Sequence, residues 1–179
     1  NEVYRYNEET GNFDLYYQLP GENLEIICMH IYKGYLWMGT TTNGVYRLDI
    51  DKKELTHPIK KGNITSFYRD SEGELWIGSW EEGLFHVKTD GKIENFRYDA
   101  KNPHSLSSNF VRACCEDNLG NIWIGTFNGL NRYNKSTGLF QNHTANDIQT
   151  DGLTHSSIWC IVKDNQGTLW LGTYFGGVN

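Results

Sequence analysis

Clustered positive charge is missing from this sequence. Its 179 residues include 16 Lys and Arg against 22 Asp and Glu, a formal net charge of −6, and no run of Lys or Arg is longer than two residues. Proteins that bind the phosphate backbone of nucleic acids without regard to sequence need clustered positive charge. We therefore do not expect nucleic acid to be a partner.

Long hydrophobic runs are missing as well. Uninterrupted apolar stretches such as 26–29 are far shorter than the roughly 20 residues that a membrane-spanning helix requires. We expect no membrane insertion by this segment. Residues 1–6 have neither the basic nor the apolar region of a signal peptide, and they are typical of the interior of a longer protein.

The chain also lacks the spacings that mark metal and cofactor sites. It has no Cys-x-x-Cys, no His-Glu-x-x-His and no cluster of Cys and His, so no metal site is expected. A nucleophile elbow, a phosphate-binding loop and a dinucleotide fingerprint are absent too. We predict no cofactor and no enzyme activity in this chain.

Cysteine is scarce, and its positions indicate packing rather than cross-linking. Cys28, Cys114, Cys115 and Cys160 fall in segments predicted to be innermost strands, where small buried residues fit. We expect free buried thiols. The alternative is a disulfide between Cys115 and Cys160, which lie in adjacent repeats but are offset in register.

The strongest feature that is present is a fourfold repeat built around tryptophan. Its copies are residues 36–40, 75–79, 122–126 and 169–173. The tryptophans at 37, 76, 123 and 170 are thus 39, 47 and 47 residues apart. This spacing is typical of propeller blades of four strands each.

Turn signals divide each repeat into strands, here called a to d. An Asp-x-x-Gly turn precedes three of the tryptophan strands, at Asp70, Asp117 and Asp164, whereas the first has only Lys33-Gly34. Strands a are predicted at 25–32, 64–69, 110–116 and 157–163, and strands d at 53–56, 92–98 and 139–143. No stretch has sustained helical periodicity. The predicted fold class is all-β: β-propeller blades of four antiparallel strands, about four repeats, in a fragment of a larger propeller.

The repeat boundaries follow from these signals. Residues 20–57, 58–98 and 99–143 are interpreted as blades and 144–179 as a partial blade. Residues 1–19 are interpreted as strands c and d of a blade, because 6–13 aligns with 133–140. Two arrangements stay open: the N-terminal strands complete the last blade, or two chains pair into a larger disc. Exposed sheet edges favour self-association of the fragment.

The motifs resemble the two-component regulator propeller repeat. Its pattern is N-P-x-S-L-S-x-N, then E-D-x-x-G-N-L-W-I-G-T, then G-L-x-R-Y-N-x-x-T-G-x-F. The third repeat carries it almost unbroken, in 102–109, 116–126 and 129–134. The resemblance covers essentially the whole chain, although the first and second repeats depart from it in the turn before the tryptophan strand and in the linker 58–63.

The resemblance implies a function as well as a fold. Such propellers form the periplasmic sensor of hybrid two-component systems that detect oligosaccharides. It therefore implies a periplasmic sensor module that binds oligosaccharide and relays the signal to a histidine kinase located elsewhere in the parent protein. The alternative is a protein-interaction or dimerisation scaffold with no ligand site in this chain.

Aromatic residues fall into two groups with different expected roles. The tryptophans of the repeat, Trp37, Trp76, Trp123 and Trp170, alternate with apolar neighbours inside a strand and are predicted to pack between blades. Better ligand candidates lie in the b–c and d–a loops, which share one face of every blade because each strand crosses the disc once. Loop aromatics beside polar groups suit a sugar, whose CH groups pack on rings and whose hydroxyls need fixed acceptors.

The candidate ligand residues are Trp80, Glu81, Phe127, Asn128, Tyr174, Phe175, His104 and His155. The same loops also hold Asp99, Asn102, Asn146, Asp147 and Asp151.

Overall fold

The computed structural model describes residues 1–21, 24–145 and 152–179. In these ranges the chain forms sixteen strands and no helix, which confirms the predicted all-β class. The described part of the chain accordingly holds no helix that could cross a membrane.

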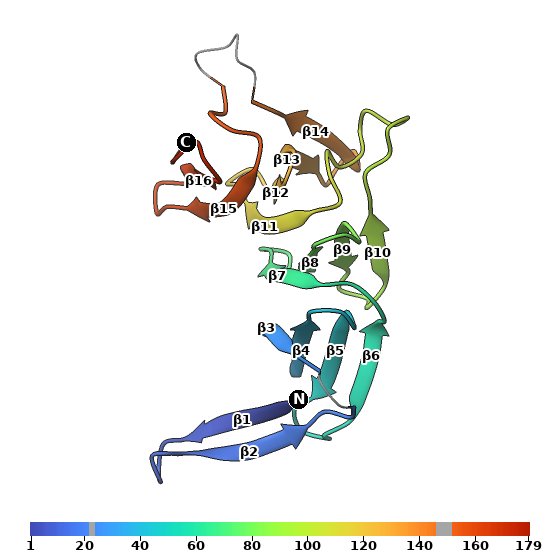
Figure 1. Cartoon of the computed structure of the whole chain (residues 1–179), viewed down its shortest axis with the longest axis vertical. Coiled ribbons are helices and arrows are strands. Elements are labelled where there is room, and N and C mark those ends of the chain that lie inside the picture. Colours follow the sequence, from blue (N-terminus) through green and yellow to red (C-terminus); the bar gives the residue numbers. More distant parts are fainter. Residues whose placement is uncertain (22–23, 146–151) are drawn as a thin grey trace. The chain divides into compact units, whose positions relative to one another are not determined.

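Three of the sheets have four antiparallel strands in sequence order, as the repeat predicts (Figure 1). Blade 1 consists of β3 (Ile26–Tyr32), β4 (Tyr35–Thr40), β5 (Val45–Asp49) and β6 (Leu55–Ile59). Blade 2 consists of β7 (Ile64–Arg69), β8 (Leu75–Ser79), β9 (Leu84–Val87) and β10 (Ile93–Phe96). Blade 3 consists of β11 (Val111–Glu116), β12 (Ile122–Thr126), β13 (Gly129–Asn134) and β14 (Leu139–His143).

Two further sheets have two strands each. One is the hairpin of β1 (Glu2–Asn7) and β2 (Asn12–Gln18), and the other, here called blade 4, pairs β15 (Ile158–Lys163) with β16 (Leu169–Thr173). The chain divides into two compact units, Asn1–Gly62 and Asn63–Asn179. The first unit therefore contains the hairpin and blade 1, and the second contains blades 2 to 4.

Each unit is held together by apolar side chains between successive sheets. In the first unit, the hairpin packs on blade 1 through a buried cluster that includes Val3, Leu19, Met38 and Leu48. In the second, blades 2 and 3 share a cluster that includes Trp76, Val111, Ile122, Tyr133 and Phe140. Blades 3 and 4 share Cys115, Leu130, Ile158, Ile161 and Leu171.

In the second unit, the glycine two residues after the repeat tryptophan permits this close packing. A Cβ atom on Gly125 would lie 2.7 Å from Cγ2 of Ile158, on strand a of the next blade. A Cβ atom on Gly78 would lie 2.6 Å from Oγ of Ser66 and 3.0 Å from Cγ1 of Val111. Glycine is therefore favoured here because side chains of strand a in the same or the next blade already occupy the space that a Cβ would need.

Every strand a contains a β-bulge at the same place. The pairing with strand b shifts register around Ile27, Thr65, Arg112 and Trp159. A bulge inserts one unpaired residue and re-aims its side chain. Each blade thus presents one extra side chain at the start of its innermost strand.

The structure corrects the predicted start and end of some strands. β6 covers Leu55–Ile59 instead of 53–56, so the predicted boundary between residues 57 and 58 falls inside a strand. Lys53 has a φ of 60° and belongs to the preceding turn, and Pro58 is tolerated because β6 is an edge strand. β10 is shorter than the predicted 92–98, while β14 has the predicted bounds.

Burial differs between the repeats, which corrects two further expectations. Trp37 and Trp76 are buried, Trp123 is partly buried and Trp170 is 50% exposed, since β16 pairs with β15 alone among the described strands. None of the four cysteines forms a disulfide, and only Cys114 and Cys115 are buried. Cys160 is exposed for the same reason as Trp170.

Candidate functional site

The a–b turns of blades 2 to 4 each contain an Asp–Trp pair. The indole Nε1 of the tryptophan donates to Oδ2 of the turn aspartate at 2.9, 2.8 and 2.9 Å in the pairs Asp70–Trp76, Asp117–Trp123 and Asp164–Trp170. The other carboxylate oxygen accepts the amide four residues later, at 2.8, 2.9 and 2.9 Å. The aspartate therefore closes the turn and accepts the hydrogen bond of the indole N–H.

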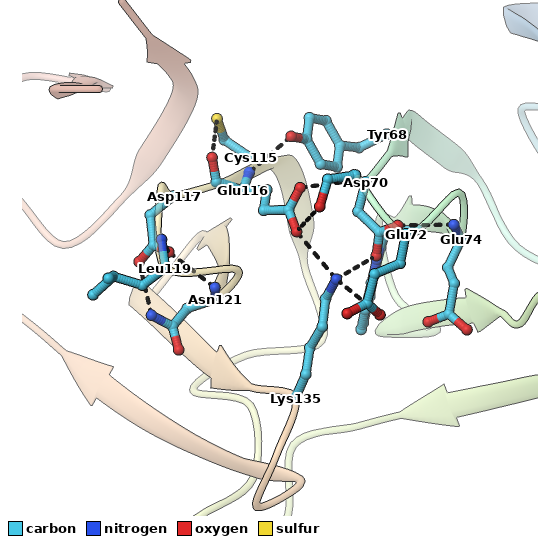
Figure 2. A network of polar contacts seen from close by, with 12 residues as sticks. Tyr68, Asp70, Glu72, Glu74, Cys115, Glu116, Asp117, Leu119, Asn121 and Lys135 are labelled. Carbon is cyan, nitrogen blue, oxygen red and sulfur yellow. Dashed lines mark hydrogen bonds and ion pairs between the residues drawn. The ribbon is translucent and has the colours of Figure 1, made fainter. Parts of the chain in front are cut away.

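Lys135 links this turn in blade 2 to blade 3 (Figure 2). Its ammonium lies 2.9 Å from Oδ2 of Asp70 and 3.1 Å from Oε1 of Glu116. Glu116 in turn accepts the amide and the hydroxyl of Ser71, at 2.7 and 2.9 Å. Because the Asp70 side chain is fully buried, its charge depends on these partners.

Asp70, Glu72 and Glu74 form a group of carboxylates close enough to share a cation. The protein supplies cationic or donor groups of its own, since Lys135 contacts Asp70 and Glu72, and His86 Nε2 lies 2.6 Å from Glu74. Burial raises the pKa of Asp70, but hydrogen bonds from Trp76, the Glu74 amide and Lys135 outweigh it and hold that pKa below its ordinary value of 3.8. We interpret this cluster as a set of ion pairs and hydrogen bonds that holds blades 2 and 3 together.

The opposite end of blades 2 to 4 gathers the loop aromatics. In each blade the first residue after strand b donates its amide to the carbonyl just before strand a: Trp80 to Asn63 at 2.8 Å, Phe127 to Phe110 at 3.0 Å and Tyr174 to Ser157 at 3.0 Å. The b–c loop and the approach to strand a therefore lie side by side. Trp80, Phe127 and Tyr174 occupy equivalent positions in three successive blades.

These side chains join into one continuous series, here called the aromatic row. Its members in order of contact are Phe127, Phe110, Trp80, Arg112, Trp159, Tyr174, Phe175 and His155. Ring centroids of successive aromatic members lie 4.2 to 6.1 Å apart. Four rings of the row are half or more exposed: Phe127 (54%), Trp159 (50%), Tyr174 (52%) and Phe175 (80%).

Arg112 joins the two halves of the row. Its Cζ lies 4.7 Å from the ring centroid of Trp80 and 3.6 Å from that of Trp159. Arg112 and Trp159 are the bulge residues of β11 and β15, so the bulges bring both side chains into the row. Burial lowers the pKa of Arg112, and a guanidinium remains charged despite such a shift.

Five of the predicted ligand residues come together in the row: Trp80, Phe127, Tyr174, Phe175 and His155. Glu81 and Asn128 are exposed in the same b–c loops. His104 lies elsewhere, against β14, where its Nδ1 is 3.4 Å from the Phe140 carbonyl. Asn146, Asp147 and Asp151 lie outside the described residues.

Sequence reasoning missed Phe110, Arg112 and Trp159. Each belongs to or adjoins a predicted innermost strand, where the alternating pattern suggested burial. A comparison of equivalent repeat positions could have found Arg112 and Trp159, because Ile27, Thr65, Arg112 and Trp159 differ widely, while the residue before each is Ile or Val and the residue after each is small.

The repeat pattern is that of a known family. The family model described as two component regulator propeller matches residues 58–81, 105–128 and 152–175. These three segments are therefore similar to two component regulator propeller repeats. Each matched repeat of this family includes strands a and b of one blade and ends in the b–c loop that contributes Trp80, Phe127 or Tyr174 to the row.

Solved structures similar to these propeller repeats identify the fold. A streptogramin B lyase is 15% identical with a TM-score of 0.68, over 100% of this chain and 61% of that one. The WD40 beta propeller domain of Doa1 is 15% identical with a TM-score of 0.61, over 92% and 53%. At these identities the likeness concerns the fold, so the blades are those of a β-propeller.

A third similar structure comes from B. thetaiotaomicron. The extracellular domain of a putative hybrid two component system from this organism is 19% identical, with a TM-score of 0.48 over 99% of this chain and 29% of that one. In all three comparisons the chain spans less than two thirds of the solved chain. No curated protein matches the sequence significantly.

Proposed function

We propose that this chain is part of an extracytoplasmic sensor of a two-component system and that its aromatic row binds an oligosaccharide. The observation that carries the proposal is the row itself, which brings rings from three successive blades into contact, four of them half or more exposed. Exposed aromatic faces suit the CH faces of sugar rings, and neighbouring polar groups fix hydroxyls. Loops on a rigid sheet framework are a common place for such a site.

The match of three segments to the repeat family supports the sensor part of the proposal, since the family is named for two component regulators. The relay to a histidine kinase belongs to regions of the parent protein outside this chain. Ligand binding can shift the receptor between states only if the ligand has different affinities for them. A periplasmic location and the absence of catalysis are parts of the same proposal.

Calorimetric titration of the 179-residue chain with a panel of oligosaccharides tests the proposal. We expect saturable heat with one glycan class, and a loss of affinity of roughly tenfold or more in Trp159→Ala and in Tyr174→Ala. His104→Ala is the matched control, because this exposed aromatic side chain lies away from the row. Silence across the panel, or an equal loss in the control, would contradict sugar binding by the row.

An interaction scaffold is the second candidate, and a separate observation in the first unit favours it. Ile27, Met29 and Ile31 alternate along β3 and are 44%, 57% and 66% exposed. Apolar side chains exposed together are typical of surfaces that bind protein. Under this reading the chain self-associates in light scattering and Met29→Lys reverses the association. A monomer at all concentrations would count against it.

A further inference from the structure

We propose that the aromatic row selects an acidic saccharide and that Arg112 binds its carboxylate or sulfate group. This inference rests on the proposed function and names the chemical class of its ligand. It follows from the place and the unused hydrogen-bonding capacity of one side chain.

Arg112 is the one cationic residue among the eight members of the row as the structure describes it. Its guanidinium lies between the rings of Trp80 and Trp159, and the side chain is partly exposed. A cation stacked on two indoles is held in place by attraction to both ring faces. Its position is therefore set before any ligand arrives.

No described residue accepts a hydrogen bond from Arg112 or forms an ion pair with it, and its Nε is buried without a partner. A guanidinium carries five N–H donors, and its planar fork matches the two oxygens of a carboxylate or sulfate. Stacking alone would leave these donors unused, which is costly for a partly buried cation. An anionic ligand group supplies the missing acceptors.

The other charged side chains near Trp80 do not offer a free cation to a ligand. Arg97 forms an ion pair with Glu82 and contacts the Glu81 carbonyl, so this arginine is already paired. The Glu81 side chain is exposed in the loop that begins at Trp80. Its negative charge opposes an acidic ligand, and we expect Glu81→Gln to tighten acidic saccharide binding about twofold or threefold.

Exposed rings beside Arg112 form the surface on which the sugar ring packs. Trp159 and Tyr174 are stacked at 5.4 Å, and both are about half exposed. A sugar packed on this pair lies next to the guanidinium, because Arg112 contacts the Trp159 ring at 3.6 Å. The acid group on the sugar then meets the cation while its CH face meets the indole.

Three tetrasaccharides titrated into the chain test the inference: α-1,4-linked galacturonate, which carries only carboxylates, κ-carrageenan, which carries only sulfate esters, and neutral maltotetraose. We expect at least one acidic probe to bind more tightly than maltotetraose, and Arg112→Gln to weaken it roughly tenfold or more. Arg112→Lys keeps the charge but loses the fork, so it should fall between the wild type and Arg112→Gln. Affinity of the acidic probe should decrease with added salt. The two acidic arms distinguish a carboxylate from a sulfate ester.

Arg132→Gln is the matched control. This arginine also stacks on an indole, that of Trp123 at 6.0 Å, and its Nε also lacks a partner, but it lies on β13 outside the row. Circular dichroism and the midpoint of thermal unfolding verify that each variant is folded. If Arg112→Gln is not folded, Arg112→Lys replaces it in the binding test.

The outcomes separate this inference from the proposed function. Binding of maltotetraose that depends on Trp159 but not on Arg112 would keep the sugar site and overturn its acidic preference. Equal weakening of acidic and neutral probes by Arg112→Gln would likewise overturn it. Binding of no saccharide at all would remove both the inference and the proposed function.

Discussion

Blade 1 and the blades of the second unit share one framework but differ at both of its ends. At the a–b turn, blade 1 has Lys33-Gly34, and the buried Nε1 of Trp37 has no partner among the described residues. In blade 2 the same atom of Trp76 donates to Asp70. Yet both tryptophans are almost completely buried, at 2% and 0% exposure. Packing alone therefore places the ring, and the aspartate adds a hydrogen bond to a position that is already fixed.

The loop ends differ in the same way. Thr41 of blade 1 donates its amide to the Glu25 carbonyl, the contact that Trp80, Phe127 and Tyr174 make in the second unit. The bulge residue of blade 1 is Ile27, where blades 3 and 4 have Arg112 and Trp159. The family model matches blades 2 to 4 but none of β3–β5. A blade thus needs only its glycines, its tryptophan and its strand pattern, while the turn and loop residues can specialise.

The largest difference in stability between a variant of the second unit and its control in blade 1 is expected for Lys135→Met. It leaves the carboxylates of Asp70 and Glu116 buried without their cation, which costs about 3–5 kcal/mol. Urea unfolding at neutral pH measures the loss. The deficit should shrink in acid, as the Asp70 carboxyl gains a proton. Lys33→Met in blade 1 is the control, and an equal loss there would show that the cluster adds nothing.

A smaller effect separates the two buried tryptophans. Trp76→Phe removes a hydrogen bond to a buried carboxylate as well as ring volume, so we expect a loss of about 2–4 kcal/mol. Trp37→Phe removes ring volume and an unpaired donor, with an expected loss of about 1 kcal/mol. Urea unfolding followed by circular dichroism measures both. Equal losses would mean that the Asp–Trp bond contributes nothing.

The smallest effect is a pH dependence that belongs to blade 2 and not to blade 1. The pKa of Asp70 is lower in the folded chain than its ordinary value of 3.8, so its contribution is complete above that value and is lost as pH falls through the folded pKa. Wild-type stability should therefore drop below about pH 4 more steeply than that of Asp70→Asn. Parallel acid profiles would contradict this assignment.

Some of the fold and part of the site could be predicted from the sequence. Strands a and b were located within one residue, since their turn glycines and tryptophans recur in every copy. Counting strand crossings placed Trp80, Phe127 and Tyr174 on one face. The predicted bounds were wrong for β6, where the turn extends to Lys53, and His104 packs on its own blade away from the row.

The sequence by itself determined the repeat, because side chains packed close to strand b leave no room for a Cβ at the glycine, and a buried ring requires an apolar strand at the same place in each blade. Only the tertiary structure decided which side chains form the row. A bulge changes the direction of one side chain without changing the residue pattern, so Arg112 and Trp159 look like ordinary strand residues in the sequence. Their contacts exist because neighbouring blades bring residues 47 positions apart within a few ångströms, as in Arg112 on Trp159.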